Sequence, residues 1–398
     1  MSTKELSRRL NSFGASATGV VHNKVNELQR AGIPILSLNV GEPDFDTPET
    51  AKEAGIAAIR EGCTKYTSTN GYAALRQAIA DKLLRDNGLK YDINEICVST
   101  GAKQAIFEAV MAICNEGDEV LIPVPSWVSY SAMVTIAGAV PVLIPSKPDY
   151  SLDIGRIEAS ITSRTRAIII CSPNNPSGAV YSEESLRALA GLAIKYDFFV
   201  ISDEIYEKLI YDGLEHKSIA SFSRDAWERT VTVNGFSKAY AMTGWRLGYA
   251  AARKDIIKAM IKLQGQITSC TSSISQKAAV GALCGSQSEM DEMVSEFKIR
   301  RDFVCERAAR IPNVSFVKPH GAFYLLLDVS FYLGKSHEGK VIDSAVSLCE
   351  YLIDTAHVAV VPGDSFGVEG FIRIAYANSM DVLSKALDEI EKALLLLE

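Results

Sequence analysis

The sequence predicts an α/β protein: a three-layer sandwich with a mostly parallel central sheet, joined to a smaller α+β domain. Two patterns carry this prediction. Through the middle of the chain, continuous apolar runs alternate with helical segments, which is typical of parallel strands covered on both faces by helices. Toward the C-terminus the runs become short strands with helices between and after them. The length of 398 residues independently favours two domains.

The elements of the larger domain can be assigned in order. A strand-like run, ICVST, leads into a helix in which Ile106, Val110 and Ile113 share one face. A second amphipathic helix is expected at 182–196. The other apolar runs of this domain indicate strands at 119–123, 166–172, 198–202, 230–236 and 247–251.

The smaller domain is expected from four strand-like runs, at 314–317, 322–329, 358–363 and 371–377. A long helical segment near 290–310 precedes them, and we place the domain boundary within it. The N-terminal segment carries helix and loop signals, and we expect it to pack on this second domain. The predicted domains are therefore residues 45–295, and residues 1–44 together with 296–398.

Composition excludes several classes of function. The net charge is −7, and no basic run suggests a nucleic-acid partner. The segment Met1–Leu10 lacks the apolar core of a secretory signal, and no apolar stretch approaches the roughly 18 residues of a membrane span. The eight cysteines are scattered, and the five histidines have no metal-ligand spacing. We expect a cytoplasmic protein with free thiols, no metal, and no membrane or nucleic-acid partner.

Glycine-containing or polar segments follow several predicted strands, where ligands gather in an open α/β sheet. The turn at Gly101, Ala102 and Lys103 starts a helix, and small residues there allow backbone N–H groups to approach a phosphate. A proline-rich loop, SPNNPSG, contains Asn175. Taken alone, either segment could be an ordinary turn or loop.

Two further segments carry ionisable side chains. Asp203 ends a predicted strand and is closely followed by Tyr206; in isolation this acid could simply cap a helix. Lys238 follows the strand at 230–236, and the residues after it, AYAMTGW, are not typical of a surface. A lysine in apolar surroundings has a lowered pKa and can form a Schiff base.

The motifs SPNNPSG, SDEIY and SKAYAMTGWRLG occur in this order, and with them nearly the whole chain resembles the fold-type-I aminotransferases of classes I and II. These enzymes use pyridoxal-5′-phosphate (PLP). The sequence is most similar to the aspartate aminotransferase subgroup that includes aspartate/prephenate aminotransferases. The resemblance implies that Lys238 binds PLP covalently and moves the substrate α-proton. It also implies that Asp203 pairs with the pyridinium nitrogen and that Tyr206 and Asn175 hydrogen-bond the ring 3-oxygen.

The resemblance further assigns the binding of the PLP phosphate. Arg246 and the turn at 101–103 would hold this group. Many relatives have a phosphate-binding serine three residues before the lysine, whereas this chain has Gly235 there. Ser237 is therefore a further candidate.

The remaining assignments concern the ring and the substrate. Trp127 would stack on the ring, with an ordinary core aromatic as the alternative. Arg373 would bind the substrate α-carboxylate in a bidentate pair, and backbone Gly41 would contact the same group. From its position between Ile372 and Ile374 alone, Arg373 is expected to face solvent.

These roles predict a ping-pong transamination between aspartate or glutamate and a 2-oxo acid, 2-oxoglutarate or oxaloacetate. Lys103 lies in the first turn of a helix, where the dipole disfavours a cation, so we expect it to face an anion. Ser16 and Thr18 resemble hydroxyls that close over the substrate side chain in one aspartate aminotransferase subgroup. The same three residues could hold the ring carboxylate of prephenate.

Several alternatives and associated expectations remain. Prephenate or an aromatic amino acid is an alternative substrate, and a PLP-dependent C–S lyase would share the cofactor residues. A transcription regulator on this fold would need an added helix-turn-helix domain, which we do not expect here. The segment at 65–76 resembles one whose tyrosine reaches the partner's phosphate, so Tyr66 would do so in a homodimer. Related enzymes also predict cis bonds at Val124–Pro125 and Asn175–Pro176.

Overall fold

The computed structural model describes residues 7–14 and 17–398 of the chain. Its helices are α1 Ala17–Arg30, α2 Glu49–Arg60, α3 Ala73–Asn87, α4 Gly101–Ile113, α5 Ser129–Ile136, α6 Ile154–Ala159, α7 Glu183–Tyr196, α8 Arg224–Arg229, α9 Lys254–Ile267, α10 Ser273–Cys284, α11 Ser288–Ala308, α12 Ala345–Ala356 and α13 Met380–Leu395. Its strands are β1 Leu36–Ser37, β2 Ile96–Ser99, β3 Glu119–Val124, β4 Val140–Pro145, β5 Thr165–Cys171, β6 Phe199–Asp203, β7 Thr230–Gly235, β8 Gly248–Ala251, β9 Ser315–Phe316, β10 Tyr324–Asp328, β11 Ser336–His337, β12 Lys340–Val341, β13 Val358–Ala359, β14 Val361–Pro362 and β15 Phe371–Ala375.

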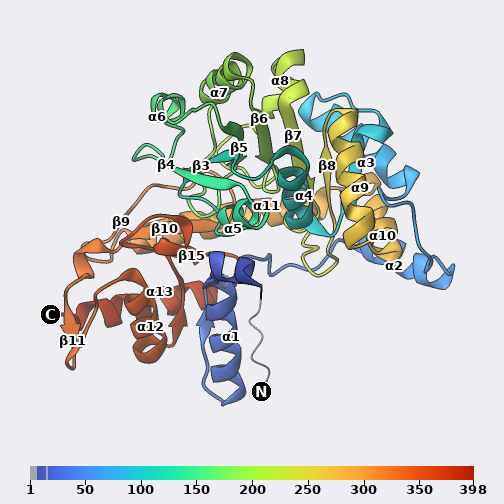
Figure 1. Ribbon diagram of the computed structural model, residues 1–398. Helices are drawn as coiled ribbons and strands as arrows, with labels where there is room; N and C mark the ends of the chain where they lie inside the picture. Colours follow the sequence, from blue (N-terminus) through green and yellow to red (C-terminus); the bar gives the residue numbers. More distant parts are fainter. Residues whose placement is uncertain (1–6, 15–16) are drawn as a thin grey trace, which may run out of the picture.

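The larger lobe is built on a seven-stranded sheet in the order β2-β8-β7-β6-β5-β3-β4 (Figure 1). Its strands run parallel except β8, which is antiparallel to both neighbours. Successive residues of β5 face opposite layers: Ile169 packs in the core that contains α4, and Ile168 and Ile170 pack with Leu189 of α7. Helices therefore cover both faces, which is why the inner strands are buried and largely apolar, and the predicted fold class is confirmed.

The edge strand β4 is absent from the sequence prediction. It reads VPVLIP, and Val140 and Leu143 are exposed on it. Proline has no N–H to donate to a neighbouring strand and is tolerated only at the edge of a sheet. Pro141 and Pro145 therefore make the sequence of β4 look unlike a strand.

The smaller lobe has an antiparallel sheet in the order β14-β15-β10-β9, with α12 and α13 alongside (Figure 1). The N-terminal segment joins it, because β1 pairs in parallel with β13. Val25 and Ile35 pack there against Ile353 and Ala359. The predicted boundary between residues 295 and 296 falls inside the continuous helix α11, and the division into domains stays a prediction.

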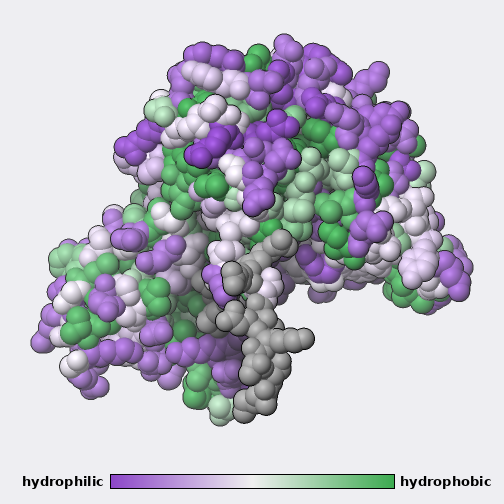
Figure 2. Space-filling view, in the orientation of Figure 1, coloured by the Kyte–Doolittle hydropathy of each residue, from purple (hydrophilic) through white to green (hydrophobic). Residues whose placement is uncertain are grey.

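The surface is mixed rather than dominated by one kind of residue. Figure 2 shows hydrophilic and hydrophobic residues interspersed over both lobes. Among the helices that the structure describes, none combines the length and the apolar character needed to cross a bilayer.

Candidate active site

A cavity of about 310 Å³ lies where β5, β6 and β7 end, beside β15 of the smaller sheet. The residues named from the sequence that line it are Gly41, Ala102, Lys103, Trp127, Asn175, Asp203, Tyr206, Ser237, Lys238, Arg246 and Arg373. Segments far apart in the chain thus meet at the carboxyl ends of the strands, as expected for an open α/β sheet. The other lining residues are Asn39, Val40, Glu42, Tyr130, Cys171, Ile205, Thr243 and Tyr324.

Lys238 extends into this cavity from the segment that follows β7. Its Nζ donates a hydrogen bond to the carbonyl of Gly41. Burial lowers the pKa of Lys238 to about 8, and the nearby Arg373 and Arg246 act in the same direction against the carboxylate of Glu42. A neutral amine is therefore accessible near physiological pH, as a nucleophile or a base requires.

Asp203 occupies the end of β6 and is buried. The hydroxyl of Tyr130 donates to its Oδ2 at 2.6 Å, and the N–H of Ile205 donates to its Oδ1 at 3.3 Å. Burial raises the pKa of Asp203 to about 6. A carboxyl held in this way favours a cationic partner inside the cavity.

Arg373 is only 2% exposed, so the expectation that it faces solvent is wrong. Its strand β15 lies between β14 and β10, and the side chain points to the cavity instead. The guanidinium donates to Asn175 Oδ1 at 3.1 Å and to the carbonyl of Asn39 at 2.7 Å. Its Nε has no hydrogen-bond partner among the described residues.

Tyr324 links several of these groups. Its hydroxyl lies 2.8 Å from the hydroxyl of Tyr206, and its ring centroid lies 4.4 Å from Cζ of Arg373. A Cβ on Gly41 would lie 2.4 Å from the Tyr324 hydroxyl. Glycine at position 41 therefore lets the chain pass against this tyrosine.

The N-terminus of α4 forms another wall of the cavity. Gly101 has a φ of +78°, and a Cβ there would lie 2.5 Å from Nη2 of Arg246. A Cβ on Gly248 would lie 2.3 Å from the backbone nitrogen of Ala102. Two glycines thus bring a guanidinium and a strand against the first turn of a helix, whose N–H groups have no partner within the helix. This wall is suited to bind an anion.

Lys103 lies at the exposed rim of the cavity, with its Nζ 4.8 Å from the centroid of a Trp127 ring. Partial burial of the ammonium lowers the pKa of Lys103, and Arg246 acts in the same direction. Lys103, assigned to the phosphate and the substrate side chain, therefore contacts Trp127, assigned to the ring of PLP.

Four predicted site residues are not among those that line the cavity. Gly101 starts α4 and packs against Arg246, but does not itself line the cavity. Tyr66 lies on the segment between α2 and α3, is 92% exposed, and does not line the cavity. Ser16 lies outside the described residues. Thr18 belongs to α1, but the structure does not describe its side chain.

Some lining residues that the prediction omits had a usable signal. Asn39 and Glu42 flank Gly41 in the same motif, and Thr243 lies between Lys238 and Arg246. Thr243 donates to Glu42 Oε2 at 2.8 Å, and its carbonyl accepts from Arg246 at 2.9 Å. The predicted cis bonds at Val124–Pro125 and Asn175–Pro176 are present, and Ser172–Pro173 is cis as well.

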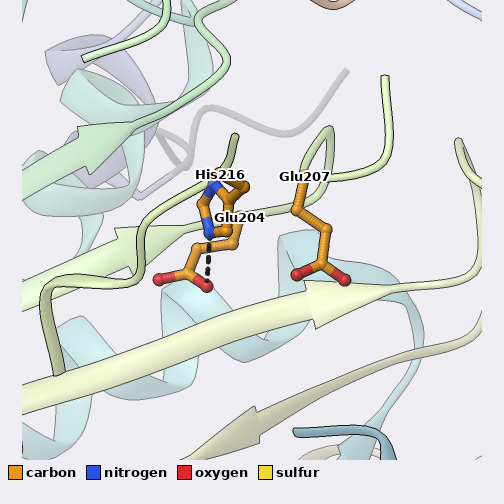
Figure 3. A group of neighbouring side chains, drawn as sticks. All are labelled: Glu204, Glu207 and His216. Carbon is orange, nitrogen blue, oxygen red and sulfur yellow. Dashed lines mark hydrogen bonds and ion pairs between the residues drawn. The ribbon is translucent and has the colours of Figure 1, made fainter. Parts of the chain in front are cut away.

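Beside the cavity, but not lining it, is a cluster of Glu204, Glu207 and His216 (Figure 3). One ligand atom from each lies within 4.8 Å of the others, as in a metal site. The oxygens are already engaged, however. Glu207 pairs with the buried ammonium of Lys82 and accepts from Asn87 at 2.8 Å.

Glu204 is satisfied in the same way. It accepts from Ser202 at 2.9 Å and from Ser218 at 2.7 Å, and its other oxygen lies 3.0 Å from Nε2 of His216. Every carboxylate oxygen is bonded and an ammonium is already present, so the cluster is a polar network that supports the segment after β6, although Nδ1 of His216 has no partner among the described residues.

Comparison with known proteins assigns the chain to a family. Residues 33–390 match the model for aminotransferase class I and II. The bifunctional aspartate aminotransferase and glutamate/aspartate-prephenate aminotransferase of Petunia hybrida is 48% identical over 397 residues, which cover 98% of this chain and 82% of that protein. A probable aspartate/prephenate aminotransferase of Aquifex aeolicus is 43% identical over 395 residues, covering 98% and 99%.

Solved structures agree. The aspartate aminotransferase of Rhizobium meliloti superposes with a TM-score of 0.95 at 43% identity, covering 99% of this chain and 100% of the other. The aspartate aminotransferase of Thermus thermophilus with maleate gives 0.92 at 42% identity, covering 98% and 100%. The resemblance inferred from the motifs is thereby confirmed, and the chain belongs to the class I and II aminotransferases.

Proposed function

We propose that the protein is a PLP-dependent aminotransferase that moves an amino group between aspartate or glutamate and a 2-oxo acid. The observation that carries this proposal is the position of Lys238. Its amine, with a pKa lowered to about 8 by burial, shares one cavity with the buried Asp203 carboxylate and the buried Arg373 guanidinium. An amine, an acid and a carboxylate-binding cation are the groups that amino-group transfer on PLP needs.

The residues of the cavity fit PLP. Asp203 is buried and would be stabilised in its charged form by a protonated ring nitrogen. The first turn of α4, together with Arg246 and Ser237, supplies donors and positive charge for a phosphate. The unpartnered Nε of Arg373 leaves a buried donor for a ligand acceptor.

When bound, PLP supplies an electron-withdrawing ring that stabilises negative charge at the substrate Cα. Arg373 orients the substrate by binding its α-carboxylate, while Asn175 and Asn39 hold the guanidinium in place. Lys238, in its neutral form, takes up the α-proton at Nζ and returns it later. Trp127, which lines the cavity, would stack on the ring.

For the substrate side chain we propose that Lys103 binds a distal carboxylate, with Ser16 and Thr18 as further donors. Lys103 is a cation at the rim of the cavity, beside Trp127. The relatives described above carry the names of aspartate and aspartate/prephenate aminotransferases, which favours acidic substrates. Prephenate, which also carries a second carboxylate, is the second candidate.

We further propose a cytoplasmic homodimer in which Tyr66 reaches the phosphate of the partner subunit's PLP. In the single chain Tyr66 is 92% exposed, and Arg246 and Lys103 are exposed at the rim. Ile56 and Ile59 of α2, near Tyr66 in sequence, are also exposed. Burying Tyr66, Ile56 and Ile59 against a second copy would remove apolar surface from water. It would also bring the partner subunit's Tyr66 to the phosphate end of the site.

Trapping and a substrate panel together test the proposal. The protein with PLP should absorb in the near-ultraviolet to visible range, and borohydride should fix the label on Lys238. A label on Lys103 would overturn the assignment. Aspartate or glutamate should then be converted over many turnovers only with a 2-oxo acid present; pyruvate and ammonia formed from a sulfur-containing amino acid without an acceptor would instead indicate a lyase.

A further inference from the structure

The helix that begins at the cavity carries a buried acid that lies outside the site. Glu108 of α4 is 0% exposed, and its Oε2 has no hydrogen-bond partner among the described residues. Burial raises the pKa of Glu108 to about 7. Burying a carboxyl without a cation costs free energy, so its retention calls for an explanation.

Glu108 determines the orientation of one amide. Its Oε1 accepts a hydrogen bond from Nε2 of Gln104 at 2.8 Å, and the hydroxyl of Thr268 accepts the second from the same nitrogen at 2.8 Å. Both N–H groups of the amide are thereby used. When Glu108 is ionised, the reversed orientation would place the amide oxygen against a carboxylate oxygen, and the contact would be repulsive.

The other end of this amide holds the start of the helix. Oε1 of Gln104 accepts a hydrogen bond from the backbone N–H of Thr100 at 2.7 Å. Thr100 is the N-cap of α4, yet its own side chain makes no capping hydrogen bond. Gln104 therefore fixes the turn from the side, and the first-turn N–H groups after Thr100 remain available to an anion.

The turn is also confined on its opposite side. Gly248 packs so closely that a Cβ would lie 2.3 Å from the nitrogen of Ala102. On the cavity side, Arg246 packs against Gly101. Strand, guanidinium and amide thus all contact this turn, and the Gln104 amide is one of the groups that set the position of its backbone N–H groups.

We propose that Glu108 and Gln104 are positioning residues for phosphate binding. The buried carboxyl orients the amide, and the amide holds the turn at 100–103 in the shape that receives the phosphate of PLP. The inference rests on the PLP site proposed above. It adds Glu108 and Gln104, neither of which lines the cavity, to the residues on which cofactor binding depends.

The test compares two aldehydes that differ only in the phosphate. Apo-protein is titrated with PLP and with pyridoxal, and the ratio of the two Kd values isolates the contribution of the phosphate. Glu108→Leu removes the acceptor at similar volume, Gln104→Met removes the amide, and Glu108→Gln keeps an acceptor oxygen for Gln104. Thermal unfolding of each apo-protein checks the fold.

We expect Glu108→Leu and Gln104→Met to lose about tenfold in affinity for PLP relative to pyridoxal, since Gln104→Met removes the hydrogen bond to the turn and Glu108→Leu removes the acceptor that orients it. Glu108→Gln should keep the wild-type ratio. Equal losses for both aldehydes, no loss, or a loss in Glu108→Gln as large as in Glu108→Leu would each overturn the inference.

Two safeguards keep the outcome decisive. If Glu108→Leu does not fold, Gln104→Met, at a half-buried position, carries the test alone. If the wild-type apo-protein itself binds PLP no more tightly than pyridoxal, the proposed phosphate site is what fails. That failure can be told apart from a failure of the Glu108 and Gln104 proposal, because it is seen in the wild type without any variant.

Discussion

Removing the ammonium at the rim of the cavity should separate acidic from apolar substrates. In Lys103→Ala, the distal carboxylate of aspartate would lose its charged partner, whereas the side chain of phenylalanine has none to lose. A hydrogen bond to a charged group contributes about 1.5–3 kcal/mol, or about ten- to a hundredfold in kcat/KM. Lys103 is exposed in the single chain, so water screens the pair and we expect the lower part of this range.

The assay measures kcat/KM for both donors with 2-oxoglutarate as acceptor, in the wild type and in Lys103→Ala. Lys195→Ala is a matched control, because it removes an exposed lysine that also packs on a ring, with Nζ 4.6 Å from the Tyr196 centroid, away from the cavity. The control should leave both donors unchanged. Equal losses for aspartate and phenylalanine in Lys103→Ala would show that Lys103 serves the cofactor or the fold, and would refute the reasoning.

Three further outcomes are expected. Tyr324→Phe removes the hydroxyl bonded to Tyr206, which is the proposed partner of the ring 3-oxygen. The pKa of the imine between Lys238 and PLP, read from the absorbance of the loaded protein, should therefore rise by about 0.7 unit, the equivalent of one hydrogen bond. An unchanged titration would contradict this. The rate at which pyridoxal labels the apo-protein should rise with pH, with the midpoint of the rise near pH 8, because only the neutral amine of Lys238 reacts. A midpoint at pH 10.5, the ordinary pKa of a lysine, would argue against the lowered pKa. Mixing Lys238→Ala chains with Tyr66→Phe chains should restore activity above either parent, since one site of the mixed dimer carries neither change; no gain would count against shared sites.

The sequence predicts the fold well where burial alone decides the pattern. The strands β5, β6 and β7 lie inside the sheet with helices on both faces, so their residues are mostly buried and largely apolar. The edge strand β4 has one open side and contains prolines, and a pattern of buried residues does not reveal it. The antiparallel direction of β8 also depends on the path of the connecting chain, which residue types do not encode.

The site divides in a similar way. Lys238 and Asp203 can be found because Asp203 ends a buried strand and Lys238 comes shortly after another, each within a recognisable motif. Tyr130 and Tyr324 belong to no motif, and their bonds to Asp203 and Tyr206 arise only when separate elements pack together. The same applies to Arg373. Its burial depends on the strands beside β15 and not on the alternation of apolar and polar residues within β15 itself.

The short backbone segment that carries Asn39 and Gly41 has a thermodynamic consequence. It is anchored by β1 on the smaller lobe, and its carbonyls accept hydrogen bonds from Arg373 and Lys238 in the free protein. A lysine or arginine side chain has about 2 kcal/mol of rotamer entropy to lose when it is immobilised. Because Arg373 is restrained before a substrate arrives, its share of this loss belongs to folding rather than to binding. Calorimetry should therefore show a smaller entropic penalty for a dicarboxylate than a site with freely rotating cations would impose.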